Sequence, residues 1–234
     1  MSEILQPSVF SLPSDPATMT IDRSLRKPDP GLPDKVIDDI FAGKRAFAWC
    51  GSDEETDRGE PEDEFGLLAG SFDPMHDGHR LLRRAAADFL EIPVYFELTV
   101  RNADKPALDR QTIQCRFRQL RNDTLLLTSA VTFADKSKLL PNTTFVVGID
   151  TAIRVIAPRF YSDSEQCMFA AFDQLRGDGC RLMVAGRVID GVYRAAEQFS
   201  VPDGYADLFV ALPETAFRVD VSSTELRSRD QLMC

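Results

Sequence analysis

The two histidines of this 234-residue chain lie three positions apart, at His76 and His79. Both fall in the run Gly70-Ser71-Phe72-Asp73-Pro74-Met75-His76-Asp77-Gly78-His79, which follows a short apolar stretch and precedes an amphipathic one. On a first helical turn this spacing places both rings on one side. Imidazoles there can donate hydrogen bonds to phosphate oxygens and stabilise the charge of phosphoryl transfer. The pattern predicts a phosphate site at a strand–turn–helix junction.

Two glycines frame this run. Gly70 ends the predicted strand, and without a Cβ it lets another group approach the backbone closely. Gly78 opens the predicted helix, whose free N–H groups and dipole favour an anion. A metal pair is the alternative, because Asp73 and Asp77 lie nearby, but no other histidine or local cysteine completes a zinc set. We therefore favour phosphate and assign no metal ligand.

A second run, Val221-Ser222-Ser223-Thr224-Glu225-Leu226-Arg227, has the pattern of a helix start. Ser222 and Glu225 form a capping box, and capping alone would account for the pattern. The same free N–H groups, together with Ser223, Thr224 and the guanidinium of Arg227, can also hold a polyphosphate. The two interpretations are compatible.

The first run resembles the H-x-G-H motif of the nucleotidyltransferase superfamily, and the second resembles its I-S-S-T-x-I-R motif. This superfamily includes the nicotinate/nicotinamide mononucleotide adenylyltransferases, the phosphopantetheine adenylyltransferases and the glycerol-phosphate-type cytidylyltransferases. The resemblance covers roughly residues 65–230. The Ser-Ser-Thr-Glu-Leu-Arg form of the second motif is most similar to that of the mononucleotide adenylyltransferases.

This resemblance implies roles for individual residues. Those with implied catalytic roles are His76, His79, Lys105 and Arg227. Those with implied nucleotide-binding roles are Gly70, Ser71, Phe72, Asp73, Gly78, Gly148, Asp150, Ser222, Ser223 and Thr224. Among them, Gly148 and Asp150 match the G-x-D that holds the nucleoside, and Lys105 matches a lysine near the transferred phosphate. Arg116 and Arg187 are weaker candidates for substrate contacts.

The acceptor half of the site departs from the family pattern. Bacterial nicotinate mononucleotide adenylyltransferases usually carry a tryptophan shortly after G-x-D that stacks on the pyridine. Here the sequence reads Ala152-Ile153-Arg154-Val155-Ile156, and the single tryptophan is Trp49. The resemblance therefore leaves the acceptor open.

Alternation of strands and helices from Phe65 onward predicts an α/β fold, a Rossmann-like doubly wound parallel sheet with ligands at the carboxyl ends of its strands. The expected strands cover 66–71, 93–99, 124–128, 144–149, 181–186 and 208–212. The expected helices cover 78–90, 110–121, 150–157, 163–176, 190–198 and 223–230. Earlier in the chain, Asp34 is expected to cap a short helix over 34–42, with Gly43 at its stop, and residues 46–50 form a short strand.

Charge and proline divide the chain in two. Residues 1–64, with fifteen acidic and seven basic residues, are predicted to be a proline-rich extension and linker. Residues 65–234, with twenty-two and twenty, are predicted to be the nucleotidyltransferase domain. Neither part has the basic excess that binding to nucleic acid requires. The absence of a long apolar run argues against a membrane span. Five scattered cysteines, no signal peptide and an ordinary composition favour reduced thiols in a cytoplasmic protein.

These inferences predict an enzyme that transfers AMP from ATP to a phosphate-bearing acceptor, with release of pyrophosphate. The acceptor is a small phosphorylated compound, nicotinate or nicotinamide mononucleotide by resemblance. Magnesium is expected to accompany the triphosphate, held largely by phosphates and water. Three alternatives stay open: transfer of CMP or to another phosphomonoester, a regulatory module that binds nucleotide without turnover, and a role for residues 1–64 in binding a protein partner. Homo-oligomerisation is also left open.

Overall fold

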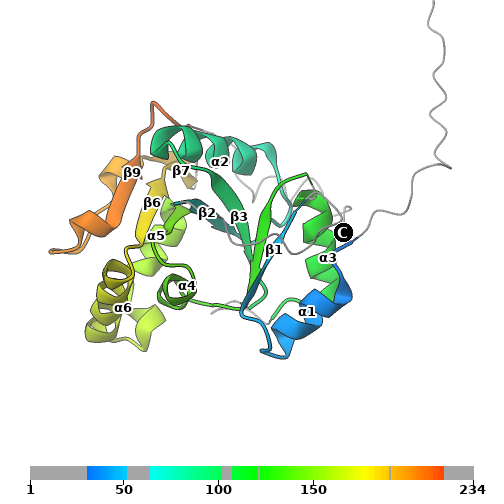
Figure 1. Cartoon of the computed structure of the whole chain (residues 1–234). Helices are drawn as coiled ribbons and strands as arrows, with labels where there is room; N and C mark the ends of the chain where they lie inside the picture. The colour runs from blue at the N-terminus through cyan, green and yellow to red at the C-terminus, as the bar shows by residue number, and fades with distance from the viewer. Residues whose placement is uncertain (1–30, 52–63, 102–106, 121, 190, 219–234) are drawn as a thin grey trace, which may run out of the picture.

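A seven-stranded sheet forms the centre of the computed structural model (Figure 1), which describes residues 31–51, 64–101, 107–120, 122–189 and 191–218. The sheet order is β1-β4-β3-β2-β5-β6-β9. Its strands are β1 (Phe47–Cys50), β2 (Gly66–Gly70), β3 (Val94–Thr99), β4 (Leu125–Thr128), β5 (Thr144–Gly148), β6 (Arg181–Ala185) and β9 (Phe209–Leu212). All neighbouring strands are parallel except β1 and β4, which are antiparallel.

The six parallel strands have the order of a doubly wound dinucleotide-binding sheet. Taken in sequence order from β2 to β9, they lie side by side as 3-2-1-4-5-6. The order reverses between β2 and β5, and such a switch point opens a crevice at the carboxyl ends of the strands. The fold class predicted from the alternating pattern is confirmed.

Helices cover both faces of the sheet. The main helices are α1 (Asp34–Phe41), α2 (Asp77–Leu90), α3 (Arg110–Leu120), α4 (Phe133–Leu139), α5 (Ile149–Val155) and α6 (Glu165–Gly177), with short 3-10 turns at Pro158–Tyr161, Ala196–Gln198 and Ala206–Leu208. One buried cluster joins the sheet to α1, α2 and α3, and the other joins it to α5 and α6. Leu67 and Leu68 lie in different clusters because successive strand residues point to opposite faces. This two-sided burial is the reason for the continuous apolar runs of the strands.

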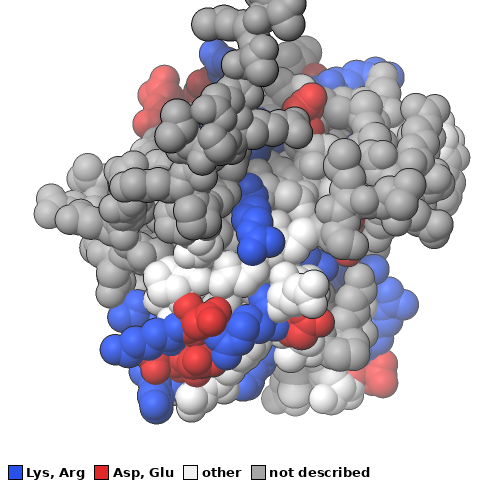
Figure 2. Space-filling model, turned by 90° about the vertical axis from the view of Figure 1, so that its right-hand side faces the viewer, with Lys and Arg blue, Asp and Glu red and all other residues white. Residues whose placement is uncertain are grey.

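Part of the predicted N-terminal extension packs onto the body. β1 pairs along its length with β4, from Phe47 opposite Thr128 to Cys50 opposite Leu125. The face that carries α1 and α3 shows intermixed basic and acidic side chains (Figure 2), and ion pairs from Arg110 to Asp34 and to Asp38 join these two helices. The short helix and strand predicted for this segment are therefore confirmed.

Several sequence predictions of local structure are wrong. A helix was expected over 190–198, but β7 (Arg187–Ile189) and β8 (Val192–Arg194) form an antiparallel hairpin there. Gly191 in the hairpin has a φ of +76°, which a right-handed helix excludes. Helix α4 was not predicted. Asp34 does not cap α1: Pro33 occupies the cap position, and no side chain caps the helix.

Two further findings concern expectations from composition. In the parts of the chain that the structure describes, no helix is long and apolar enough to cross a membrane. Cys50, Cys167 and Cys180 are reduced cysteines outside any disulfide. Cys115 is disulfide-bonded, which departs from the expectation of reduced thiols throughout.

Candidate functional site

The turn between β2 and α2 brings the two histidines together. His76 has an extended backbone at the N-cap of α2, and His79 occupies the third helical position. The backbone N–H of His76 donates a hydrogen bond to Nδ1 of His79 at 3.3 Å, and the ring centroids lie 3.8 Å apart. The rings therefore share one side of the helix start, as their spacing predicted. Gly78 is the second residue of this helix.

Both imidazoles are held in the neutral form. Burial, His76 and Arg187 together lower the pKa of His79 from 6.5 to about 3, with burial the largest cause. Burial and Arg187 also lower the pKa of His76, against a smaller opposing effect of Asp77. Because Nδ1 of His79 accepts a hydrogen bond, its proton lies on Nε2. His79 can thus donate one hydrogen bond to a phosphate oxygen throughout the neutral pH range without carrying charge.

The buried side chain of Phe72 packs against this turn from the core. Its side chain is 1% exposed and makes edge-to-face contacts with Phe96, at 5.3 Å between centroids, and with His79, at 5.2 Å. A Cβ on Gly70 would lie 2.7 Å from the Phe72 ring, so the glycine leaves space for this ring. The resemblance implied nucleotide contacts for both residues. Phe72 is buried in the core against His79, and Gly70 also lines the cavity described below, so the implied nucleotide contacts stay predictions.

A second polar group, the pair of Asp150 and Arg187, lies on the other side of the switch point from the histidines. Asp150, in the first turn of α5, receives two hydrogen bonds from the Arg187 guanidinium, at 3.1 and 3.2 Å. A Cβ on Gly148 would lie 3.0 Å from Oδ1 of Asp150 and 3.7 Å from Cδ of Arg187. The glycine at the end of β5 therefore gives this pair room. Arg187 also lies close enough to lower the pKa of both histidines.

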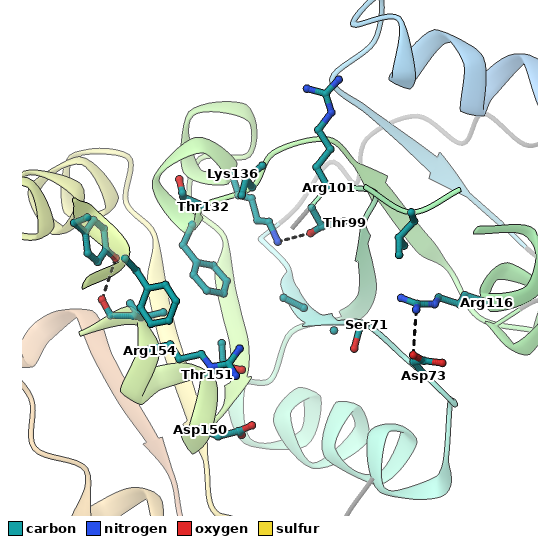
Figure 3. Close-up of a pocket in the computed structure, with 18 residues that line it drawn as sticks. Ser71, Asp73, Thr99, Arg101, Arg116, Thr132, Lys136, Asp150, Thr151 and Arg154 are labelled. Carbon is teal, nitrogen blue, oxygen red and sulfur yellow. Dashed lines mark hydrogen bonds and ion pairs between the residues drawn. The ribbon is translucent and has the colours of Figure 1, made fainter. Parts of the chain in front are cut away.

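A cavity of about 380 Å³ opens along the carboxyl ends of the central strands (Figure 3). Its lining includes Ser71 and Asp73 from the first predicted motif and Asp150 from the G-x-D. An apolar wall contains Phe133, Phe160 and Tyr161, among others. The Tyr161 hydroxyl donates to the Val155 carbonyl oxygen at 2.9 Å, and burial raises its pKa to about 12, so this wall carries no charge at neutral pH.

Two cationic groups of the cavity are held by carboxylates. Arg116, 9% exposed, lies 3.3 Å from Oδ2 of Asp73, and burial lowers its pKa. Lys136 is 4% exposed, and its Nζ lies 2.7 Å from Oε2 of Glu97, itself fully buried on β3. Arg101 and Arg154 also line the cavity.

The sequence motifs predicted some of these residues and not others. The structure gathers His76, His79, Ser71, Asp73, Gly148 and Asp150 at one end of the sheet, and it adds the weaker candidates Arg116 and Arg187. The sequence motifs did not predict the basic and aromatic groups of the cavity, of which Lys136, Arg101, Phe133 and Phe160 are examples. The capping pair Thr132 and Asp135 at the start of α4 was an available signal for that helix. The predicted residues Lys105, Ser222, Ser223, Thr224 and Arg227 lie outside the described residues.

Within the described ranges, no three His, Cys, Asp or Glu side chains are grouped as metal ligands. Asp73 and Asp150 are each paired with an arginine. A magnesium ion that arrives with a triphosphate would therefore find few uncommitted carboxylates among them, and phosphates and water would supply most of its ligands.

Comparison with known proteins places this site in a family. A search of curated proteins found no match. Among solved structures, the Plasmodium falciparum nicotinic acid mononucleotide adenylyltransferase complexed with NaAD is similar at a TM-score of 0.41 and 14% identity, over 71% of this chain and 83% of that chain. A family model described as cytidylyltransferase-like matches residues 67–229, more than half of the chain and including both predicted motifs. The chain therefore belongs to the cytidylyltransferase-like family of nucleotidyltransferases.

Proposed function

We propose that this protein transfers the AMP group of ATP to the phosphate of a small acceptor and releases pyrophosphate. The observation that carries the proposal is the neutral histidine pair at the start of α2, next to Arg187 and at the switch point of the sheet. Helix N-termini and switch points are the places where α/β folds bind phosphates.

In the proposed reaction, an oxygen of the acceptor phosphate attacks the α-phosphorus of the triphosphate in line. The new P–O bond joins the acceptor to the nucleotide, and the bond between the α-phosphorus and the bridging oxygen breaks. Pyrophosphate leaves with the electron pair of that bond. His76 and His79 stabilise the oxygens of the phosphate chain by hydrogen bonding, and Arg187 supplies positive charge beside them.

Asp150 and Gly148 are proposed to position the nucleoside, as the resemblance implies. Ser222, Ser223, Thr224 and Arg227 are proposed to hold the β- and γ-phosphates, and Lys105 to lie near the reacting phosphate. Magnesium, when bound with the triphosphate, supplies additional neutralisation of phosphate charge. The apolar wall and basic groups of the cavity are proposed to bind the acceptor.

The test is an assay of pyrophosphate release with ATP and a set of phosphorylated acceptors that includes nicotinate and nicotinamide mononucleotides. His79→Ala is expected to lower turnover by about 100-fold or more, since a preorganised donor to a reacting oxygen contributes on that order. Arg84→Ala is the matched control, because Arg84 is exposed on the same helix and its ion pair with Asp88 is 4.0 Å long. Near-normal turnover of His79→Ala, with an intact fold, would refute the mechanism.

The family description gives a second candidate, transfer of CMP from CTP. The same assay with CTP in place of ATP distinguishes the two, because the base of the favoured nucleotide gives the higher kcat/KM. A third outcome, stabilisation of the protein by nucleotide without product from any acceptor, would instead favour a regulatory nucleotide-binding module.

A further inference from the structure

A buried charged pair, Glu97 and Lys136, lies at the wall of the cavity, and the proposed transfer of a nucleotide gives its carboxylate no role. Glu97 is fully buried on β3, and Lys136 is 4% exposed on α4. Both point toward a face of the sheet that is otherwise packed with apolar residues. Burial of two charges in such a place is costly, and apolar side chains of similar size commonly serve stability as well. The pair therefore calls for another explanation.

The ammonium group of Lys136 makes two hydrogen bonds within this cluster, and it also lies over the Phe133 ring, 5.2 Å from the ring centroid. This group has three N–H bonds. One lies toward Oε2 of Glu97, at 2.7 Å, and another toward Oγ1 of Thr99, at 2.9 Å. The Thr99 hydroxyl in turn donates to Oε1 of Glu97 at 2.7 Å, so both carboxylate oxygens and the threonine are engaged. Because Lys136, Thr99 and Phe133 all line the cavity, a molecule bound there can accept the third N–H in place of the Phe133 ring.

The pair lies away from the proposed phosphate site. Figure 3 shows Lys136 and Thr99 on one side of the cavity, with Asp73 and Asp150 toward the other. Tyr95, Glu97 and Thr99 lie on the same face of β3, because they are two residues apart on the strand. Tyr95 packs in the cluster on the α5 and α6 face, whereas α2 packs on the opposite face. A molecule that fills this cavity with one end at Ser71 and Asp73 would therefore present its other end to Lys136.

We propose that Lys136, neutralised by Glu97 and oriented by Thr99, binds an uncharged oxygen-bearing group of the acceptor, such as a carboxamide, and disfavours a carboxylate at the same position. This inference rests on the proposed function, because it takes the cavity to be the acceptor site. It assigns to the three residues the discrimination between acceptors that share the same phosphate.

The reason lies in the charge balance of the pair. A carbonyl oxygen can accept the third N–H of Lys136, and its dehydration is cheap. A carboxylate has a much larger dehydration cost, and the buried carboxylate of Glu97 behind the ammonium cancels most of the attraction that would offset it. Removal of the Glu97 charge alone leaves the positive charge of Lys136 without a compensating negative charge. The preference should then move toward the carboxylate.

The experiment compares two acceptors that differ at this one group, nicotinamide mononucleotide and nicotinate mononucleotide, with ATP as the donor. We expect the wild-type enzyme to give the higher kcat/KM with the carboxamide. Glu97→Gln should shift the ratio of the two kcat/KM values toward the carboxylate by tenfold or more. Lys136→Met should raise the KM of the carboxamide while the KM of ATP stays within twofold. Lys138→Met, at an exposed position of α4, is the matched control and should behave as wild type.

The test remains decisive even if one of the single variants is too unstable to fold. If a single variant fails to fold, the double variant Glu97→Gln/Lys136→Met removes both charges together, and it should fold and show no preference between the acceptors. An unchanged acceptor ratio in folded Glu97→Gln, or a retained wild-type preference in the double variant, would overturn the proposal.

Calorimetric titration of both mononucleotides separates this inference from the proposed function. Selective binding of the carboxamide without turnover would refute nucleotide transfer and leave the recognition intact. Turnover with equal kcat/KM for the two acceptors, unaltered in every variant, would refute the discrimination by Lys136 and leave nucleotide transfer intact. Absence of both binding and turnover would refute both.

Discussion

The protonation of His79 gives the sharpest test of the site, because its pKa falls from 6.5 to about 3 in the folded protein. The unfolded chain binds a proton at this residue below pH 6.5, whereas the folded chain does so only near pH 3. Its contribution to stability is therefore complete above pH 6.5 and decreases as the pH falls from 6.5 toward 3. For one such group, the free energy of unfolding should drop by about 2 kcal/mol between pH 7 and pH 5.

This change can be isolated by comparison of two proteins. Urea unfolding of wild type and of His79→Gln at both pH values gives the free energy of unfolding, and the variant should lose about 2 kcal/mol less than wild type over that interval. The difference cancels the contributions of carboxylates distant from position 79, which the two proteins share.

A spectroscopic measurement checks the same reasoning directly. The chain contains two histidines, so selective labelling gives two imidazole signals in an NMR titration. The chemical shift of the His79 imidazole should not change between pH 7.5 and pH 5. In the pyrophosphate-release assay, the pH profile of turnover should show no inflection at pH 6.5 that arises from His79. A midpoint near 6.5 for His79, or equal losses of stability in wild type and His79→Gln, would refute the proposed burial and the neutral-donor role.

Three further predictions follow from contacts around the histidines. Phe72→Ala should lower the free energy of unfolding by about 3–5 kcal/mol in urea, as removal of a buried aromatic ring does; a loss below 1 kcal/mol would contradict its burial. Arg187→Ala should weaken binding of ATP tenfold or more in calorimetric titration and raise the pKa of His79 in the NMR titration, and no change in either would exclude Arg187 from the phosphate site. Gly148→Ala should raise the KM of ATP, since its Cβ would lie 3.0 Å from Oδ1 of Asp150; an unaltered KM would show that this pair does not position the nucleotide.

Much of the fold could be predicted from local pattern. Strands buried on both faces require continuous apolar runs, as at Phe145-Val146-Val147, and the helices between them have amphipathic spacing. Parallel strands with intervening helices leave few topologies. The hairpin β7–β8 was missed although Asp190-Gly191 is a typical hairpin signal, because the surrounding residues also fit a short helix. Helix α4 was missed because its buried positions are Lys136 and Ser137, where an amphipathic pattern would have apolar residues.

The candidate site divides in the same way. The sequence by itself determined the histidine pair, because their spacing on a first helical turn sets which side of the helix they share. The tertiary structure alone decided that Arg187 pairs with Asp150 and that Lys136 pairs with Glu97, each across more than thirty residues. It also decided that both histidines are neutral, because burial and the nearby guanidinium come from elements far apart in the chain. Local spacing fixes local geometry, whereas burial and charge depend on which distant segments the sheet brings side by side.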